Sequence, residues 1–143
     1  MGGVLARREA EAIAKKGVTA VLDLTSEFSE AAPLRTVAYK NIPILDLTAP
    51  TTEQLQEAAA FIQQESETGI VYVHCKIGYS RTAAIAAAYL LRAGLAGSVS
   101  EAIERIRQAR PGIVIRPEVM TAVALLFGDR ARVSPRLGGA LLQ

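Results

Sequence analysis

The chain has 143 residues, of which 50% are hydrophobic and 21% are charged, and its formal net charge is +2. These values are typical of one soluble globular domain, and so small a net charge argues against nucleic-acid binding. The single cysteine and single histidine exclude an internal disulfide and a zinc site built from those residues. A lone cysteine also favours a reducing compartment, so we expect a cytoplasmic location.

The N-terminal half alternates between helical and strand patterns. In chain order, the sequence predicts a helix over 6–16, strands over 18–24 and 36–45, a helix over 52–66 and a strand over 70–75. Gly17 is a natural end for the first helix, and Thr52 is a plausible N-cap for the second. Pro43 favours an edge position or an irregular end for the second strand, because proline cannot donate to a sheet ladder.

The C-terminal half is helical. It predicts helices over 81–93, 98–110 and 117–128, followed by a basic tail over 130–143. Either Ser98 or Ser100 is expected to cap the middle helix, and Pro117 suits the first turn of the last one. The alternation of strands and helices predicts an α/β fold, with a small central and mostly parallel sheet flanked by helices. We expect one domain over residues 1–129. Since little precedes the first helix, this domain is either reduced at its N-terminus or cut from a longer polypeptide.

The stretch "VHCKIGYSRT", residues 73–82, contains both unique residues side by side. Cys75 ends a buried strand, and a five-residue loop leads to a helix that begins at Arg81. The loop amides and the helix N-terminus converge on one point, which is the arrangement of an anion site and stabilises a thiolate there. Gly78 permits the tight turn, and Thr82 offers a hydroxyl beside the sulfur. The side chain of His74 faces away from Cys75, so it is expected to orient the loop rather than act as a base.

This arrangement suits transfer of a phosphoryl group to sulfur. A thiolate attacks phosphorus, and Arg81 grips two oxygens of the phosphate in a bidentate fork. Lys76 either adds positive potential at the mouth of the pocket or is a solvated lysine. The expected phosphate-binding residues form one run: Lys76, Ile77, Gly78, Tyr79, Ser80 and Arg81. No metal and no cofactor are needed, because amides and guanidinium neutralise the charge.

The leaving alcohol needs a proton from a carboxylic acid. Asp23 and Asp46 both lie at the end of a strand, and the carboxyl ends of parallel strands share the edge that Cys75 also occupies. Asp129 lies beyond the last predicted helix. The residues alone leave both Asp23 and Asp46 as candidates, with Asp46 in the longer loop. Arg116 either reaches a second acidic group or forms a structural ion pair.

His74–Thr82 resembles the HCxxGxxR(S/T) loop of the cysteine-dependent protein tyrosine phosphatase superfamily, in its dual-specificity branch. The similarity extends over about residues 17–127. Within that branch, "VYVHCKIGYSR", "EAIERIR" and "IVIRP" look most like the mitochondrial phosphatidylglycerophosphate phosphatases and their bacterial relatives, and "DLTAPT" resembles their acid loop. The resemblance implies a dual-specificity-phosphatase-like fold, with Cys75 as nucleophile, Arg81 as phosphate binder and Asp46 as general acid.

The expected function is therefore a metal-independent phosphomonoesterase of the dual-specificity or lipid phosphatase type. The alternatives are a phosphoprotein phosphatase without lipid activity and a non-catalytic phosphate-binding module. The expected partner is a phosphopeptide or a phospholipid head group, with no nucleic acid. The arginine-rich C-terminal part either fits an acidic substrate or a membrane surface, or consists of solvated helix faces and a basic tail. Nothing in the sequence indicates an oligomeric state.

Overall fold

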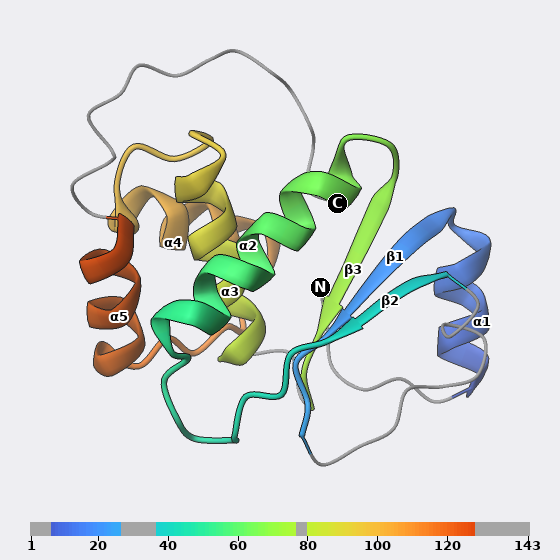
Figure 1. Ribbon diagram of the computed structural model, residues 1–143, viewed down its shortest axis with the longest axis horizontal. Helices are drawn as coiled ribbons and strands as arrows, with labels where there is room; N and C mark the ends of the chain where they lie inside the picture. Colours follow the sequence, from blue (N-terminus) through green and yellow to red (C-terminus); the bar gives the residue numbers. More distant parts are fainter. Residues whose placement is uncertain (1–6, 27–36, 77–79, 128–143) are drawn as a thin grey trace.

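In the part of the chain that the structure describes, three parallel strands form the sheet, and the first of them in the chain lies between the second and the third. The structure is a computed structural model that describes residues 7–26, 37–76 and 80–127 (Figure 1). In chain order the elements are α1 (Arg7–Lys15), β1 (Val18–Asp23), β2 (Ala38–Asn41), α2 (Thr52–Ser66), β3 (Ile70–His74), α3 (Arg81–Arg92), α4 (Val99–Ala109) and α5 (Pro117–Phe127). The predicted α/β class with a small parallel sheet is confirmed within these residues.

The helices cover the sheet unequally. α1 packs on one face, and α2, α3, α4 and α5 lie on the other (Figure 1). Side chains alternate between the two faces, as they must in strands. Val21 and Tyr72 pack against Ala10 of α1, whereas Leu22 and Val73 belong to the larger core beneath the other helices. Consecutive residues at the end of β3 therefore face opposite layers.

The edge strand β2 is shorter than the sequence predicts. It ends at Asn41, although the backbone N–H groups of Ile42 and Ile44 still donate to the carbonyls of Asp23 and Leu24 at 2.9 and 3.2 Å. Pro43 lies between these two donors, where an N–H would point away from β1, so a proline is tolerated on this outer side of the strand. The prediction of an edge strand is confirmed, and its predicted end at residue 45 is too late.

The helix ends follow from local chemistry. Thr51, not the predicted Thr52, caps α2: its side chain accepts from Gln54 N at 3.2 Å, while Gln54 Oε1 accepts from Thr51 N at 2.9 Å. This is a capping box, and it requires Gln three residues after the cap. Ser98 caps α4. Gly17 and Gly94 follow α1 and α3 with φ of 86° and 70°, a conformation that glycine adopts without strain.

α3 is the most enclosed helix. It packs against α2, α4 and α5, and its alanines at positions 83, 84, 87 and 88 are at most 2% exposed. Small side chains let the neighbouring helices approach closely, so the position of α3 is fixed from several sides. The backbone of Arg81, the first residue of α3, is therefore also fixed.

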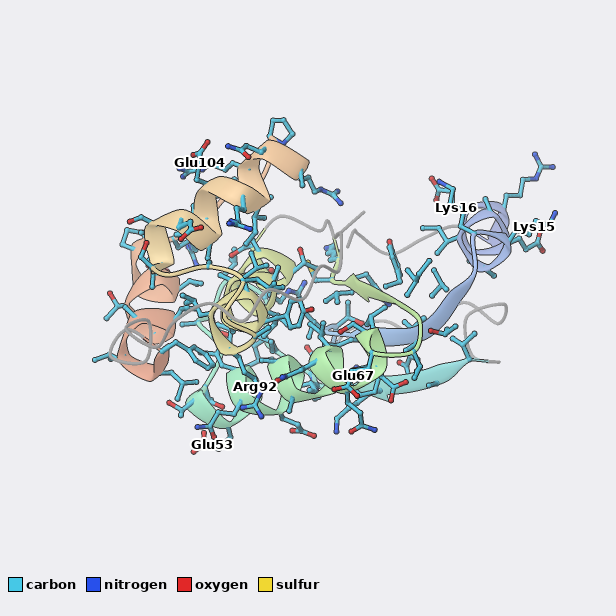
Figure 2. The ribbon with its side chains drawn as sticks, turned by 90° about the horizontal axis from the view of Figure 1, so that it is seen from above. Lys15, Lys16, Glu53, Glu67, Arg92 and Glu104 are labelled. Carbon is cyan, nitrogen blue, oxygen red and sulfur yellow. The ribbon has the colours of Figure 1, made fainter. Side chains whose placement is uncertain are left out.

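Charged side chains lie at the periphery of the helical layer. Figure 2 shows Glu53 and Glu67 of the α2 region and Glu104 of α4 on the outside of the molecule. Arg92, in the last turn of α3, donates through Nε to Gln63 Oε1 at 3.0 Å and so ties α3 to α2. None of the helices in the described ranges is long and apolar enough to span a bilayer.

Candidate active site

A pocket opens at the carboxyl end of β3, beside the N-terminus of α3. Its described lining combines the predicted nucleophile, phosphate binder and acid with rim residues from two other loops: Asp46, Leu47, Cys75, Lys76, Ser80, Arg81, Val114 and Arg116. Residues separated by up to 70 positions in the chain thus meet at one edge of the sheet. This is the edge where parallel α/β folds usually bind their ligands.

Cys75 follows β3 directly and is 3% exposed. Its Sγ lies 4.0 Å from Oγ1 of Thr82, in the first turn of α3. Thr82 is fully buried, so its hydroxyl is held beside the sulfur by the surrounding core. A hydroxyl in this position can donate a hydrogen bond to a thiolate.

The Arg81 side chain is almost completely buried, yet it lines the pocket. Nη1 donates to the Ile44 carbonyl at 2.9 Å, and Nη2 lies 3.5 Å from Asp46 Oδ1. Ser80, the residue before α3, makes no side-chain capping bond to the helix within the described residues. The helix N-terminus and the guanidinium therefore both face the pocket, and both attract anions.

Asp46 belongs to the turn that follows β2. Its side chain is 53% exposed, and its Oδ1 accepts from the backbone N–H of Leu47 at 3.0 Å. Leu47 has φ of 64°, in the left-handed region. Thr48 closes the turn, because its N–H and its hydroxyl both donate to the Leu45 carbonyl, at 3.3 and 2.7 Å. The carboxylate is thus at the mouth of the pocket, with access to solvent.

Asp23 lies elsewhere, in a polar cluster on the opposite face of the sheet. Its Oδ1 accepts from the N–H and hydroxyl of Thr25 at 2.8 and 2.7 Å, and its Oδ2 accepts from the Tyr39 hydroxyl at 2.6 Å. His74, its partner in the strand register, places Nε2 3.8 Å from Oδ1 and stacks on Tyr72. Asp23 is 1% exposed and does not line the pocket, so it cannot reach a leaving group there.

The remaining predicted residues divide into two groups. Lys76 lines the pocket and is exposed, whereas Ile77, Gly78 and Tyr79 lie outside the described residues. Sequence reasoning did not place Leu47 and Val114 at the rim, because an isolated apolar residue in a loop carries no signal of its position. The sequence predicts Arg116 as an arginine for a second acidic group or a structural ion pair; in the structure it lines the pocket from the segment before α5.

The electrostatic balance of the lining is positive. Lys76, Arg81 and Arg116 face a single carboxylate, that of Asp46. Within the described ranges there is no group of three or more His, Cys, Asp or Glu side chains able to hold a metal ion. The lining is therefore suited to an anion, which the Arg81 guanidinium and the Lys76 ammonium group can bind.

Comparison with solved structures identifies the class of protein. The chain superimposes on the crystal structure of Tk-PTP in its active form with a TM-score of 0.79 and 29% sequence identity, over 92% of this chain and 90% of the other. It also superimposes on PTPMT1 in complex with PI(5)P, with a TM-score of 0.77 and 25% identity, over 90% and 89% of the two chains. These neighbours have the phosphatase fold that the sequence predicted.

Residues 4–126 match the family described as dual specificity phosphatase, catalytic domain, and the chain belongs to that family. Dual specificity protein phosphatase 19 of Mus musculus is 35% identical over 124 residues, which cover 84% of this chain and 54% of the relative. Phosphatidylglycerophosphate phosphatase PTPMT2 of Arabidopsis thaliana is 31% identical over 124 residues, covering 82% and 54%. The chain thus spans about half the length of these two curated relatives. The predicted membership of the dual-specificity branch is confirmed.

Proposed function

We propose that the chain hydrolyses phosphomonoesters without a metal, through a cysteinyl-phosphate intermediate. The observation that carries this proposal is the convergence of three groups on one pocket: the Cys75 sulfur, the Arg81 guanidinium and the Asp46 carboxylate. They supply a nucleophile, a phosphate clamp and a proton donor, which are the parts that the reaction needs.

In the first step, Cys75 Sγ attacks phosphorus and forms the S–P bond as the bond to the leaving oxygen breaks. Asp46 gives its proton to that oxygen, so the product leaves as a neutral alcohol. Arg81 stabilises the charge on the remaining phosphate oxygens. A guanidinium carries five N–H donors, so Arg81 can keep its bond to the Ile44 carbonyl while it binds two phosphate oxygens.

In the second step, water attacks the phosphocysteine and the S–P bond breaks. Asp46, now ionised, takes a proton from the water, and the sulfur leaves as a thiolate. The Thr82 hydroxyl, 4.0 Å from Sγ, donates a hydrogen bond that stabilises this leaving group. His74 faces Asp23 on the other face of the sheet, so in this proposal it fixes the end of β3 and does not touch the substrate.

Turnover of a small aryl phosphate in the presence of a chelator tests the proposal. We expect phosphate release by the wild type and at least a thousandfold loss in Cys75→Ser, since an alcohol replaces the activated thiolate. Trapping by rapid acid quench should recover phosphate bound to Cys75. A wild-type protein that binds phosphate without turning over the aryl ester would be the non-catalytic binding module instead.

We further propose that the substrate is a phosphorylated lipid head group, met at a membrane surface facing the cytoplasm. Leu45 and Leu47 are 66% and 74% exposed beside Asp46, and Val114 is 56% exposed across the pocket. An apolar rim around a basic pocket suits a phosphate attached to an apolar anchor. Relatives with phosphatidylglycerophosphate phosphatase in their names support this choice.

A panel assay distinguishes this substrate from phosphoproteins. Vesicles that contain a phosphatidylglycerol phosphomonoester should be hydrolysed with a higher kcat/KM than phosphotyrosine or phosphothreonine peptides. Cys75→Ser is the control for both. Preference for the peptides would assign the chain to the phosphoprotein phosphatases.

A further inference from the structure

We infer that Arg116 is a positioning residue for the general acid, and that it acts through the Leu47 carbonyl rather than on the substrate. The inference rests on the proposed phosphatase function. It adds the segment between α4 and α5 to the machinery that delivers the proton.

The contact is direct. Arg116 Nη1 donates to the Leu47 carbonyl at 2.6 Å, across 69 positions of sequence. The same Nη1 lies 3.4 Å from Glu118 Oε1. The guanidinium is therefore held between α5 and the turn over residues 45–48 that carries Asp46, here called the acid turn. Arg116 thus connects the two rims of the pocket.

The backbone of Arg116 is itself fixed. Its carbonyl accepts from the N–H groups of Val119 and Met120, at 3.0 and 3.1 Å, as the first turn of α5 begins. Pro117 follows directly and restricts the backbone at this junction. The guanidinium therefore projects from a rigid base.

The acid turn needs such a support. Leu47 has φ of 64°, a backbone conformation that residues other than Gly, Asn and Asp rarely adopt. In this conformation the Leu47 N–H is directed at Asp46 Oδ1 and its carbonyl at Arg116. The peptide groups on the two sides of Leu47 thus link the guanidinium to the carboxylate. Loss of the bond to Arg116 allows Leu47 to relax to negative φ, and that rotation turns the N–H away from Asp46.

This role predicts a dependence on the leaving group. A poor leaving group, such as an alkyl alcohol, needs the proton of Asp46, whereas a good one, such as a nitrophenol, leaves without it. Displacement of a catalytic group by about 1 Å can lower a rate by about a hundredfold. We expect Arg116→Met to lower kcat/KM, which reports the first step alone, on an alkyl phosphate by about tenfold to a hundredfold. On a nitrophenyl phosphate it should change kcat/KM by less than about threefold. Arg116→Lys keeps a donor but not the fork, and should fall between wild type and Arg116→Met.

The matched control is Arg105→Met. Arg105 also pairs with a glutamate on a neighbouring turn, Glu101, but it lies on the exposed face of α4, outside the pocket lining. It should change neither rate. The Tm of each variant is measured together with its rates. Partial unfolding would lower the hydrolysis rates of both esters equally, whereas a misplaced Asp46 would lower only the rate on the alkyl phosphate.

Asp46→Asn completes the test. In that background Arg116→Met should cause no further loss on the alkyl phosphate, since the group that it positions is absent. Equal losses on the two substrates, or an undiminished further loss in the double variant, would overturn the inference. If Asp46→Asn slows the alkyl phosphate and Arg116→Met does not, only the role of Arg116 fails. If Asp46→Asn leaves that rate unchanged, the acid in the proposed function fails as well.

Discussion

Replacement of Asp23 should lower stability and leave acid catalysis intact. Its carboxylate accepts hydrogen bonds from the Thr25 N–H, the Thr25 hydroxyl and the Tyr39 hydroxyl, and the side chain is 1% exposed. Asp23→Asn can keep Oδ1 in place and turn its amide toward Tyr39, whose hydroxyl accepts instead of donating. What it loses is the charge assistance, about 1 kcal/mol for each bond, so we expect a loss of about 2–3 kcal/mol. Asp23→Ala removes the acceptors altogether and should lose about 4 kcal/mol.

Thermal and urea unfolding followed by circular dichroism measure these differences. For a chain of this length, 1 kcal/mol corresponds to about 3 °C, so Tm should fall by about 8 °C in Asp23→Asn and about 12 °C in Asp23→Ala. Asp46→Asn, at a half-exposed position, should change stability by less than about 1 kcal/mol. Below its melting transition, Asp23→Asn should retain the wild-type ratio of rates on poor and good leaving groups. A Tm within 2 °C of wild type, or a selective loss on poor leaving groups, would refute the separation of the two aspartates.

Three further predictions concern the helices. The Gly97 N–H, and then Arg105, hold the pKa of Glu101 below its usual range, so its contribution to stability is present at neutral pH and lost as pH falls through the lowered value. Glu101→Gln should therefore reduce the urea midpoint at pH 7, and the difference from wild type should shrink as the pH falls below the usual range of a glutamate pKa; a constant difference at all pH values would contradict this. Thr51→Ala removes the cap of α2 and should reduce the free energy of unfolding by about 1 kcal/mol, with Thr51→Ser close to wild type. Ile85 is fully buried in α3. In urea unfolding, Ile85→Ala should reduce the free energy of unfolding by about 2–5 kcal/mol and Ile85→Val by about 1 kcal/mol. Equal reductions in the two variants would show that the structure collapses around the cavity.

The sequence predicts the central parts of the fold because they obey short periods. β1 and β3 read as continuous apolar runs, since both of their faces are covered, and the structure has them within one residue of the predicted ends. Strict alternation is also the reason that His74 could be expected to face away from Cys75. The stretch from Cys75 to Arg81 could be interpreted as a phosphate-binding loop because its nucleophile and its phosphate-binding arginine lie within a few consecutive residues.

Other features depend on contacts that no local pattern encodes. Two adjacent threonines, Thr51 and Thr52, both look like caps, and only the return bond from Gln54 distinguishes them. The ambiguity between Asp23 and Asp46 has the same origin. Both end predicted strands in similar sequences. What separates them is that Asp23 lies in β1 with its side chain away from the pocket, whereas Asp46 lies in the turn at the pocket mouth. The link from Arg116 to Leu47 joins segments far apart in the chain, and a left-handed leucine has no sequence signature.

The bond from Arg81 to the Ile44 carbonyl has a practical consequence for the choice of inactive protein. The Arg81 guanidinium joins the first turn of α3 to the segment that follows β2. Its removal would leave the buried Ile44 carbonyl without its hydrogen-bond donor. An Arg81 variant would therefore confuse loss of affinity with loss of structure. Anyone wishing to capture an uncleaved phosphomonoester, for co-crystallisation or calorimetry, should alter the sulfur instead and leave the clamp in place.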